Sequence, residues 1–406
     1  MSDRYPGGLI RKTPPTITPP TGGEGGSASG IWTMDQVAYY IKEGTWPKPV
    51  LPRELYTWGD NGFGELGQND RIPRSSPVQV GSLSWDYVDA GFYTVAAISG
   101  GKLFTWGSNS AGVLGLNDAI PRSSPVQVGA LTNWQKAVGF GGGGMVALKT
   151  DGTLWSWGNG SSGMLGLGDS GINRSSPVQI GSLTDWADVS AGSYVGLALK
   201  TNGTLWGWGY NVYGALGTNN TINYSSPVQV GALTNWLKLE GGSYFSGAVK
   251  TDGTLWTWGD NKDGCLGLNA TGIAKASSPT QVGALTTWLN LAAGRYAMYG
   301  IKTDNTLWAW GDNTYGQLGQ NDTINRSSPV QIGAADWSTL STDTFITMFG
   351  IKTNGTLWGW GLNAAGRLGD GTTISKSSPV QIGSETTWAS VSANAGHATG
   401  LLKVVS

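Results

Sequence analysis

Few residues of the chain have the chemistry that a catalytic centre requires. His397 and Cys265 are the only histidine and the only cysteine among 406 residues, so any Ser-His-Asp or Cys-His arrangement would depend on them. The same count excludes zinc sites built from cysteine and histidine, as well as disulfides within the chain. The sequence therefore predicts a protein that is not an enzyme, with His397 and Cys265 in structural positions.

Three aspartates could form a carboxylate cluster, because Asp60, Asp260 and Asp312 each follow a Trp-Gly pair. Other copies of the same string carry Ser, Asn, Tyr or Leu there, which favours a turn in which the side chain bonds to its own backbone. No Asp-x-Asp-x-Asp-Gly calcium loop occurs, and the four glycines 141–144 precede no helix that would bind phosphate. We therefore expect no catalytic residue, no metal site and no cofactor.

Two sets of basic residues recur at fixed places in a repeated string, where rings of like charge could attract an acidic partner. The first set comprises Lys149, Lys200, Lys250, Lys302, Lys352 and Lys403. The second set precedes a Ser-Ser-Pro triplet and comprises Arg74, Arg122, Arg174, Arg326 and Lys376. The alternative is that each is a solubilising residue copied along with its repeat.

Composition limits the classes of partner. The chain has 66 Gly and 21 Trp, with 13% charged and 39% hydrophobic residues, so it is poor in charge but has enough apolar surface to fold. A net charge of -1 gives no overall attraction to nucleic acid or to an anionic membrane. No apolar run approaches the ~20 residues of a bilayer span. We expect neither nucleic-acid binding nor membrane insertion.

The elements that position these residues come from an internal repeat. A Trp-Gly pair recurs seven times, with Trp at 58, 106, 157, 208, 258, 310 and 360, at a period of about 50 residues. Each unit also contains one Ser-Ser-Pro triplet and, further on, a third Trp after Gln-Val-Gly or its equivalent. A repeat of this length is typical of solenoids and propellers.

Each unit holds four short apolar strings separated by turn residues, which indicates four strands. An Asp-Gly or Asn-Gly pair, as at Asp151-Gly152, predicts a type I′ hairpin between two of them. The sequence therefore predicts an all-β, seven-bladed propeller of about 50-residue repeats. The first Trp-Gly strand, 54–58, should pair with the last apolar segment, 400–405, and close the ring without a covalent link.

The repeated tryptophans have two interpretations. The pair of aromatics in each Trp-Gly string, such as Trp155 and Trp157, fits the core of a blade. The Trp after Gln-Val-Gly, such as Trp85, Trp134 or Trp186, is the candidate to reach the blade rim, where an indole could stack on a sugar. A carbohydrate-binding propeller therefore remains one alternative.

The string Trp208-Gly209-x-Asn211-x-x-Gly214-x-Leu-Gly resembles the regulator-of-chromosome-condensation repeat, whose members form seven-bladed β-propellers. The resemblance covers roughly residues 53 to 406. The family's Ala-Gly-x-x-His string mostly lacks its His, which only His397 supplies. The exchange activity of the family's founding member is not implied, because it depends on loops outside the repeat and these units are uniform in length.

The sequence before the repeats divides into two parts. Residues 1–30 form a Pro- and Gly-rich extended arm, residues 31–52 a short helix and linker, and residues 53–406 the propeller. Thr33 and Gln36 form a capping box at the start of the helix. The candidate docking residues of this part are Ile31, Trp32, Met34, Val37, Ile41 and Trp46. They could dock on the chain's own propeller or on another subunit.

The segments 29–34 and 44–47 resemble a short Gly-x-Trp and Gly-x-Trp-Pro module of predicted virion proteins from marine tailed phages. That resemblance implies a virion surface or tail component, docked through its arm onto other virion proteins and made in the host cytoplasm. A host surface glycan or protein could then be a second partner. The alternatives are a cytoplasmic interaction scaffold of the same repeat family and a carbohydrate-binding propeller that aids host attachment.

Overall fold

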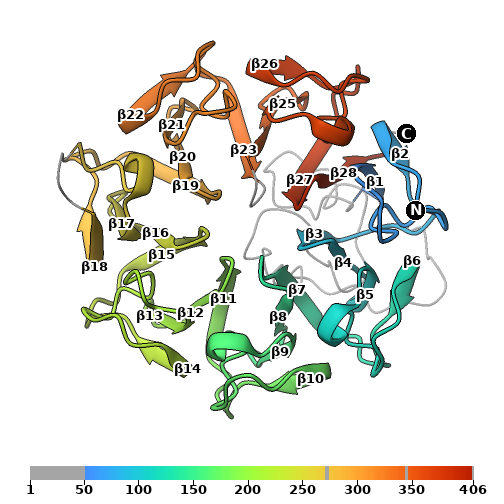
Figure 1. Cartoon of the computed structure of the whole chain (residues 1–406), viewed down its shortest axis with the longest axis horizontal. Helices are drawn as coiled ribbons and strands as arrows, with labels where there is room; N and C mark the ends of the chain where they lie inside the picture. The colour runs from blue at the N-terminus through green and yellow to red at the C-terminus, as the bar shows by residue number, and fades with distance from the viewer. Residues whose placement is uncertain (1–50, 270–273, 343–345, 405–406) are drawn as a thin grey trace, which may run out of the picture. The chain divides into compact units, whose positions relative to one another are not determined.

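The computed structural model describes residues 51–269, 274–342 and 346–404, which form a ring of seven four-stranded antiparallel sheets, the blades (Figure 1). Residues Arg53–Val404 make one compact unit. The seven-bladed propeller predicted from the repeat is confirmed. Each repeat, counted from its Trp-Gly strand, supplies the third and outer strands of one blade and the first two strands of the next, so the closing blade takes two strands from each end.

The innermost strands of the blades are β3 (Tyr87–Gly91), β7 (Trp134–Gly139), β11 (Trp186–Ala191), β15 (Trp236–Gly241), β19 (Trp288–Ala293), β23 (Trp337–Thr342) and β27 (Trp388–Asn394). The second strands are β4 (Thr94–Ser99), β8 (Gly144–Lys149), β12 (Val195–Lys200), β16 (Phe245–Lys250), β20 (Ala297–Lys302), β24 (Thr347–Lys352) and β28 (His397–Lys403).

The third strands are β1 (Arg53–Gly59), β5 (Lys102–Gly107), β9 (Leu154–Gly158), β13 (Leu205–Gly209), β17 (Leu255–Asp260), β21 (Leu307–Gly311) and β25 (Leu357–Gly361). The outer strands are β2 (Arg74–Gln79), β6 (Arg122–Gln127), β10 (Arg174–Gln179), β14 (Tyr224–Gln229), β18 (Lys275–Gln281), β22 (Arg326–Ile332) and β26 (Lys376–Gln381). Four short 3-10 turns follow third strands: η1 (Ser110–Gly112), η2 (Ser161–Gly163), η3 (Lys262–Gly264) and η4 (Ala364–Gly366).

The ring closes as the sequence predicts. Strand β1 pairs antiparallel with β28, so that Leu55 faces Leu401 and Glu54 faces Leu402. The closing blade therefore has the order β2-β1-β28-β27, with two strands from each end of the propeller. Leu55 and Leu401 are both buried, because β1 and β28 are interior strands of this blade.

The Trp of each Trp-Gly pair packs the seams between blades. All seven of these indoles have no exposed surface: Trp58, Trp106, Trp157, Trp208, Trp258, Trp310 and Trp360. Six donate Nε1–H to a backbone carbonyl of the preceding blade, as Trp157 does to Val113 at 2.8 Å. Trp58 is the exception within the described part of the chain. The core role predicted for the aromatic pair is thus confirmed for its second member, whereas the first member, such as Trp155, is half-buried.

The residues that accept these hydrogen bonds occupy one position of the repeat, at which the side-chain type differs in every unit. The accepting residues are Glu65, Val113, Met164, Ala215, Cys265 and Gln317. All six are buried. Because the backbone carbonyl makes the bond across the seam, the side chain at this position only has to fit the space. Cys265 therefore has the same packing role as the five other residues.

The hairpin between second and third strands differs from the prediction in most blades. In the β8–β9 turn the Gly152 N–H donates to the Lys149 carbonyl at 3.0 Å, and Gly152 has φ 75° while Asp151 stays outside the left-handed region. A type I′ turn needs positive φ at both central residues. Among the hairpins between second and third strands in the described residues, only Gly100 and Gly101, between β4 and β5, satisfy that. Elsewhere one extra residue enters the loop, and Gly or Asn alone takes positive φ.

Candidate functional site

The first set of repeated lysines is packed between aromatic rings. The ammonium of Lys250 lies 3.7 Å from the ring centroid of Trp256 and 4.9 Å from that of Trp236. The same arrangement recurs at Lys149, Lys200, Lys302 and Lys352. Burial lowers the pKa of Lys250. These lysines thus have partners inside their own blades; Lys403 ends β28, opposite Arg53.

The second basic set is paired with carboxylates. Arg122 and Arg326 lie 2.6 Å and 2.7 Å from an aspartate oxygen four residues earlier. The pairs are Arg74–Asp70, Arg122–Asp118, Arg174–Asp169, Arg326–Asp322 and Lys376–Asp370. Each positive charge is balanced within its own loop, which weakens the attraction that this ring would exert. Recruitment of an acidic partner by either ring stays a prediction.

The third Trp of each unit lies in the interior. Trp85, Trp134 and Trp186 are 2–3% exposed, and their rings contact the other tryptophans or Phe104 of the same blade. The expectation that these indoles reach the rim and stack on sugar is wrong. Trp134 and Trp186 begin innermost strands and pack against a repeated lysine, and Trp85 packs against Phe104 and Trp106, so none of the three faces solvent.

His397 and Cys265 lie away from solvent, as predicted for structural residues. His397 Nε2 is 3.2 Å from the Thr94 carbonyl oxygen, and burial lowers the pKa of this imidazole to about 4. The Cys265 Sγ–H donates to the Asp260 carbonyl at 3.1 Å, and burial raises the pKa of the thiol. A neutral buried imidazole and a protonated buried thiol are poorly placed for attack on a substrate.

The Asp residues after Trp-Gly make turn contacts. Asp60 accepts the Asn61 N–H at 2.8 Å, and Asp312 accepts the Thr314 N–H at 3.0 Å. Within the described residues no three His, Cys, Asp or Glu side chains are grouped to hold a metal ion. The helices of that same part include none long and apolar enough to cross a membrane.

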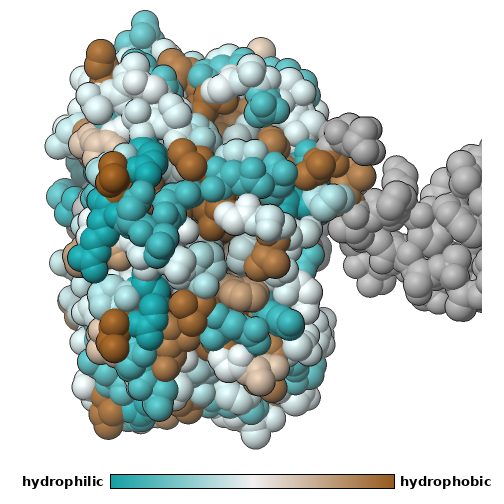
Figure 2. Space-filling model, turned by 90° about the vertical axis from the view of Figure 1, so that its right-hand side faces the viewer, coloured by the Kyte–Doolittle hydropathy of each residue, from teal (hydrophilic) through white to brown (hydrophobic). Residues whose placement is uncertain are grey.

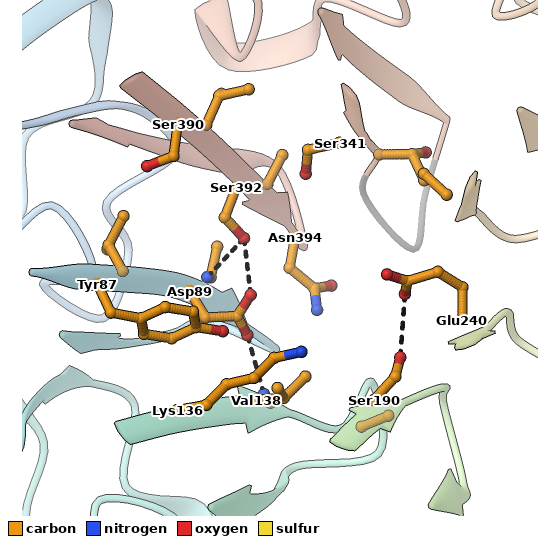
Figure 3. A pocket seen from close by; sticks show the side chains of 18 of the residues that line it. Tyr87, Asp89, Lys136, Val138, Ser190, Glu240, Ser341, Ser390, Ser392 and Asn394 are labelled. Carbon is orange, nitrogen blue, oxygen red and sulfur yellow. Dashed lines mark hydrogen bonds between the residues drawn. The ribbon is translucent and has the colours of Figure 1, made fainter. Parts of the chain in front are cut away.

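The polar site that the sequence reasoning missed is the central channel, a cavity of about 480 Å³ lined by the innermost strands of all seven blades (Figure 3). The fourth residue after each third Trp lines it, and in five units the second residue does too, because strand residues alternate between channel and core. Between them lie buried apolar residues such as Val189 and Leu239. The residue types at these two positions differ from unit to unit, while the residues between them stay apolar. This pattern in the sequence could have indicated a channel lined by variable side chains.

One half of the channel is held together by charged and hydroxyl side chains. Asp89 accepts the Gly139 N–H at 3.0 Å and the Ser392 hydroxyl at 2.9 Å, which links β3 to β7 and to β27. Lys136 pairs with Asp188 at 2.7 Å across the next seam. The Ser190 hydroxyl donates to Glu240 at 3.0 Å across the one after it (Figure 3).

The carboxylates of this half are under electrostatic strain. Burial raises the pKa of Asp89 to about 6, against hydrogen bonds from Gly139 and Ser392. Burial likewise raises the pKa of Glu240 to about 7. Burial disfavours the charge of Lys136, but Asp188 and Glu240 together raise its pKa. The Lys136 ammonium is thus the cation that interacts with the carboxylates of Asp89, Asp188 and Glu240. Glu240 takes up a proton close to neutral pH.

The remaining innermost strands, β19 and β23, present mostly small neutral groups to the channel, including Ala292, Thr339 and Ser341. Apart from the channel, exposed apolar side chains recur at two fixed positions of the units. Figure 2 shows them as separate small groups among polar residues on the side of the propeller that it draws. An apolar side chain from the loop before the outer strand is at least half exposed in six units: Ile72, Ile120, Ile172, Ile222, Ile324 and Ile374.

This geometry defines a class of protein: a rigid propeller whose repeated side chains build the blades while its divergent ones reach the channel and the loops. The chain matches the RCC1-like domain over residues 51–344 and a regulator of chromosome condensation (RCC1) repeat over residues 354–401. The chain therefore belongs to the RCC1-like domain family.

Two human relatives share part of the repeat. The E3 ubiquitin-protein ligase HERC2 is 33% identical over 173 residues, 40% of this chain and 4% of that protein. The probable E3 ubiquitin-protein ligase HERC3 is 39% identical over 77 residues, 18% of this chain and 7% of that protein. The chain therefore spans only a small fraction of these relatives.

Two solved structures share the fold across most of the chain. Human WBSCR16 gives a TM-score of 0.77 at 18% identity, covering 86% of this chain and 99% of that one. Yeast RCC1 (Prp20), in complex with Kap60, gives a TM-score of 0.78 at 16% identity, covering 88% and 90%. At these identities the likeness concerns the fold.

Proposed function

We propose that this chain is a non-enzymatic propeller that serves as a protein-interaction scaffold. One observation supports it above the others: the repeated aromatic and basic side chains are engaged in packing and internal ion pairs, whereas many side chains that differ between units line the channel or belong to loops on one face. That face, called here the variable face, consists of the turns between first and second strands and the loops between third and fourth strands. A rigid ring that presents variable loops is well suited to docking.

The relatives fit this proposal without supplying a partner. The yeast structure is of RCC1 bound to Kap60, and a second study of Prp20p concerns its binding to Gsp1p and histones. Those partners belong to those proteins, since the identity is 16–17%. A scaffold of this kind, working in the cytoplasm, is the alternative reached from the sequence, and the comparisons favour it over a virion component.

The virion interpretation stays a prediction. It depends on the arm, whose candidate residues from Ile31 to Trp46 lie outside the described residues. The comparisons give it no support. Copurification of the chain with intact particles would establish it.

The non-enzymatic part of the proposal has a direct test. Because His397 is buried against the Thr94 carbonyl and neutral at pH 7, His397→Ala should lower stability without removing partner binding. A catalytic turnover that disappears in His397→Ala, with the fold intact, would overturn it.

Site-specific crosslinking tests the scaffold itself. A photoreactive residue at Tyr213, on the variable face, should capture one partner of defined mass from the native source of the full chain. The matched control is a photoreactive residue at Leu233, which is 46% exposed and belongs to the loop between an outer strand and the next innermost strand. Equal capture from both positions, or none from Tyr213, would contradict docking on the variable face.

A further inference from the structure

Five tyrosines form a continuous aromatic surface on the variable face. The Tyr surface consists of Tyr194, Tyr210, Tyr213, Tyr244 and Tyr296, from the loops of three neighbouring blades. Their ring centroids are 5.1–6.5 Å apart. Tyr194, Tyr244 and Tyr296 share one position of the repeat, which Tyr93 fills in the first unit. A smaller equivalent contact joins Phe63 to Tyr93, but the run of five tyrosines occurs in these three neighbouring blades.

The backbone fixes the rings in place. The Tyr210 N–H donates to the Tyr194 carbonyl at 3.0 Å, which joins the loop after β13 to the turn between β11 and β12. A side chain on Gly142 would meet the ring of Tyr194 at 2.6 Å, so a glycine in the neighbouring turn makes room for that ring. In the same loop as Tyr213, Asn211 is buried and accepts the Leu216 N–H at 2.9 Å. The rings are therefore held in position before any ligand arrives.

The hydroxyl groups of the Tyr surface make no hydrogen bond to other described residues. Tyr299 donates its hydroxyl to the Gln317 carbonyl, and Tyr56 donates its own to Glu54. Within the described residues, none of the five surface tyrosines makes a side-chain hydrogen bond. Tyr213 is 37% exposed and the other four are half-buried. The surface thus offers aromatic ring area edged with neutral groups that can donate and accept hydrogen bonds.

Charges around the surface nearly cancel. The Lys262 ammonium lies 4.5 Å from the Tyr296 ring centroid, and the Arg295 guanidinium carbon lies 5.4 Å from it. Asp260 and Asp263 stand in the adjoining loop, where Lys262 and Asp263 both act electrostatically on Asp260. A balanced set of charges does not select a polyanion or a polycation.

We propose that the Tyr surface binds a neutral oligosaccharide. A pyranose ring has apolar C–H faces bordered by hydroxyl groups, and this pattern is complementary to aromatic faces bordered by free hydroxyls. One exposed aliphatic side chain, Val212, belongs to the same loop as Tyr210 and Tyr213 and is 45% exposed, so it adds apolar area beside the aromatic rings. The inference goes beyond the scaffold function and does not depend on it.

A glycan array probed with the full chain is the first experiment. Neutral oligosaccharides should bind, and the free sugar of the best hit should compete. Binding only to sulfated or sialylated glycans, or to none, would overturn the proposal. A chain that binds no glycan yet keeps a protein partner would leave the scaffold function intact.

Variants then locate the binding. Tyr213→Ala with Tyr244→Ala should weaken binding of the array hit at least tenfold, because both a stacking face and its hydroxyls are lost. Tyr315→Ala is the matched control, since Tyr315 is 46% exposed and lies in a third-to-fourth-strand loop outside the Tyr surface. Unchanged affinity in the double variant would overturn the proposal.

If the double variant proves unstable by circular dichroism, Tyr213→Phe separates the two contributions. Removing the exposed hydroxyl alone should weaken binding a few-fold while leaving the melting curve in place. If Tyr213→Phe binds with the same affinity as the parent, the Tyr213 hydroxyl makes no hydrogen bond to the sugar, and the proposed mode of recognition is refuted.

Discussion

Strands β15 and β16 lie side by side in one blade, yet one carries a charged residue that recurs in other units and the other carries a charged residue that does not. Lys250, at the end of β16, has counterparts in four other units that are likewise packed between two rings. Glu240, on β15, occupies a place where the other units carry Asp, Val, Ser or Ala, and it faces the channel with a pKa raised by burial to about 7. The repeated charge is satisfied by its own blade, and the divergent charge is not.

This difference indicates how a repeat protein separates stability from function. Positions copied in every unit supply packing, whereas positions that diverge are free to carry groups that the fold tolerates but does not need. Natural proteins accept such strain chiefly where a group serves another purpose. The experiments below test whether repeated positions are in fact the stabilising ones.

The largest effect is expected from breaking the closing blade. Deleting residues 400–406 removes most of β28, including Leu401 and Leu402, which are 1% and 7% exposed. At about 1.5–3 kcal/mol for each buried apolar side chain, the loss should reach several kcal/mol. Chemical denaturation measures it.

Deleting only residues 405–406 is the matched control and should leave the denaturation midpoint unchanged. Cysteines replacing Glu54 and Leu402, which face each other across the two strands, should crosslink within one monomer. Crosslinks found only between chains would disprove the closure.

The next largest effect concerns a seam. Trp258 is fully buried and donates to the Ala215 carbonyl at 2.8 Å. Trp258→Ala should therefore destabilise the propeller by about 3–5 kcal/mol. Ala215→Ser, which keeps the accepting carbonyl, is the comparison and should cost far less. Similar losses from both variants in a urea titration would mean that the side chain, rather than the backbone bond, secures the seam.

A smaller loss is expected at the repeated lysine. Lys250→Ala removes a buried stem and an ammonium that contacts two rings, for a loss of about 1–2 kcal/mol. Lys238→Ala, at an exposed position of β15, should change stability by less than about 0.5 kcal/mol. Equal melting temperatures for the two variants would remove the distinction between repeated and divergent lysines.

The divergent carboxylate should behave in the opposite direction. The pKa of Glu240 is raised in the folded state, so the folded chain binds its proton more tightly than the unfolded chain does. The associated stability is present below the ordinary glutamate pKa and is lost as pH rises toward 7. Glu240→Gln should thus stabilise the protein at pH 8 by roughly 1 kcal/mol, since water in the channel screens part of the charge.

At a pH of about 4.5, near the ordinary glutamate pKa, the Glu240→Gln variant and the parent should melt alike, because the parent glutamate is then largely protonated in the folded state. Differential scanning calorimetry at the two pH values gives the comparison. A variant less stable than the parent at pH 8 would show that Glu240 is a stabilising residue.

The sequence predicts the fold well because each unit repeats the same pattern of apolar strings and turn residues. Alternating apolar strings and the Trp-Gly pairs identify the strands, and the mismatch between the first and last units predicts the closing blade. The type I′ turn failed for a local reason: only Gly152 takes positive φ, and the Asp151 side chain caps the Thr153 N–H at 3.0 Å instead. The buried position of the third Trp could not be read from composition.

The candidate sites were harder to predict, because they depend on residues far apart in the sequence. Tyr213 and Tyr244 are 31 positions apart, yet their rings are 5.1 Å from each other only because neighbouring blades bring the two loops together. Asp89 and Ser392 meet across the closing seam, 303 positions apart. Periodicity emphasises what every unit shares, so it obscures the residues on which the units differ.

The closing blade also has a mechanical consequence. The two ends of the propeller leave from the same end of one strand pair, where Arg53 faces Lys403. Tension applied between the two ends would load that ladder one pair at a time, like a zipper, from Arg53–Lys403 toward Gly59–His397. A load applied between the two ends of this propeller should therefore open the closing blade first.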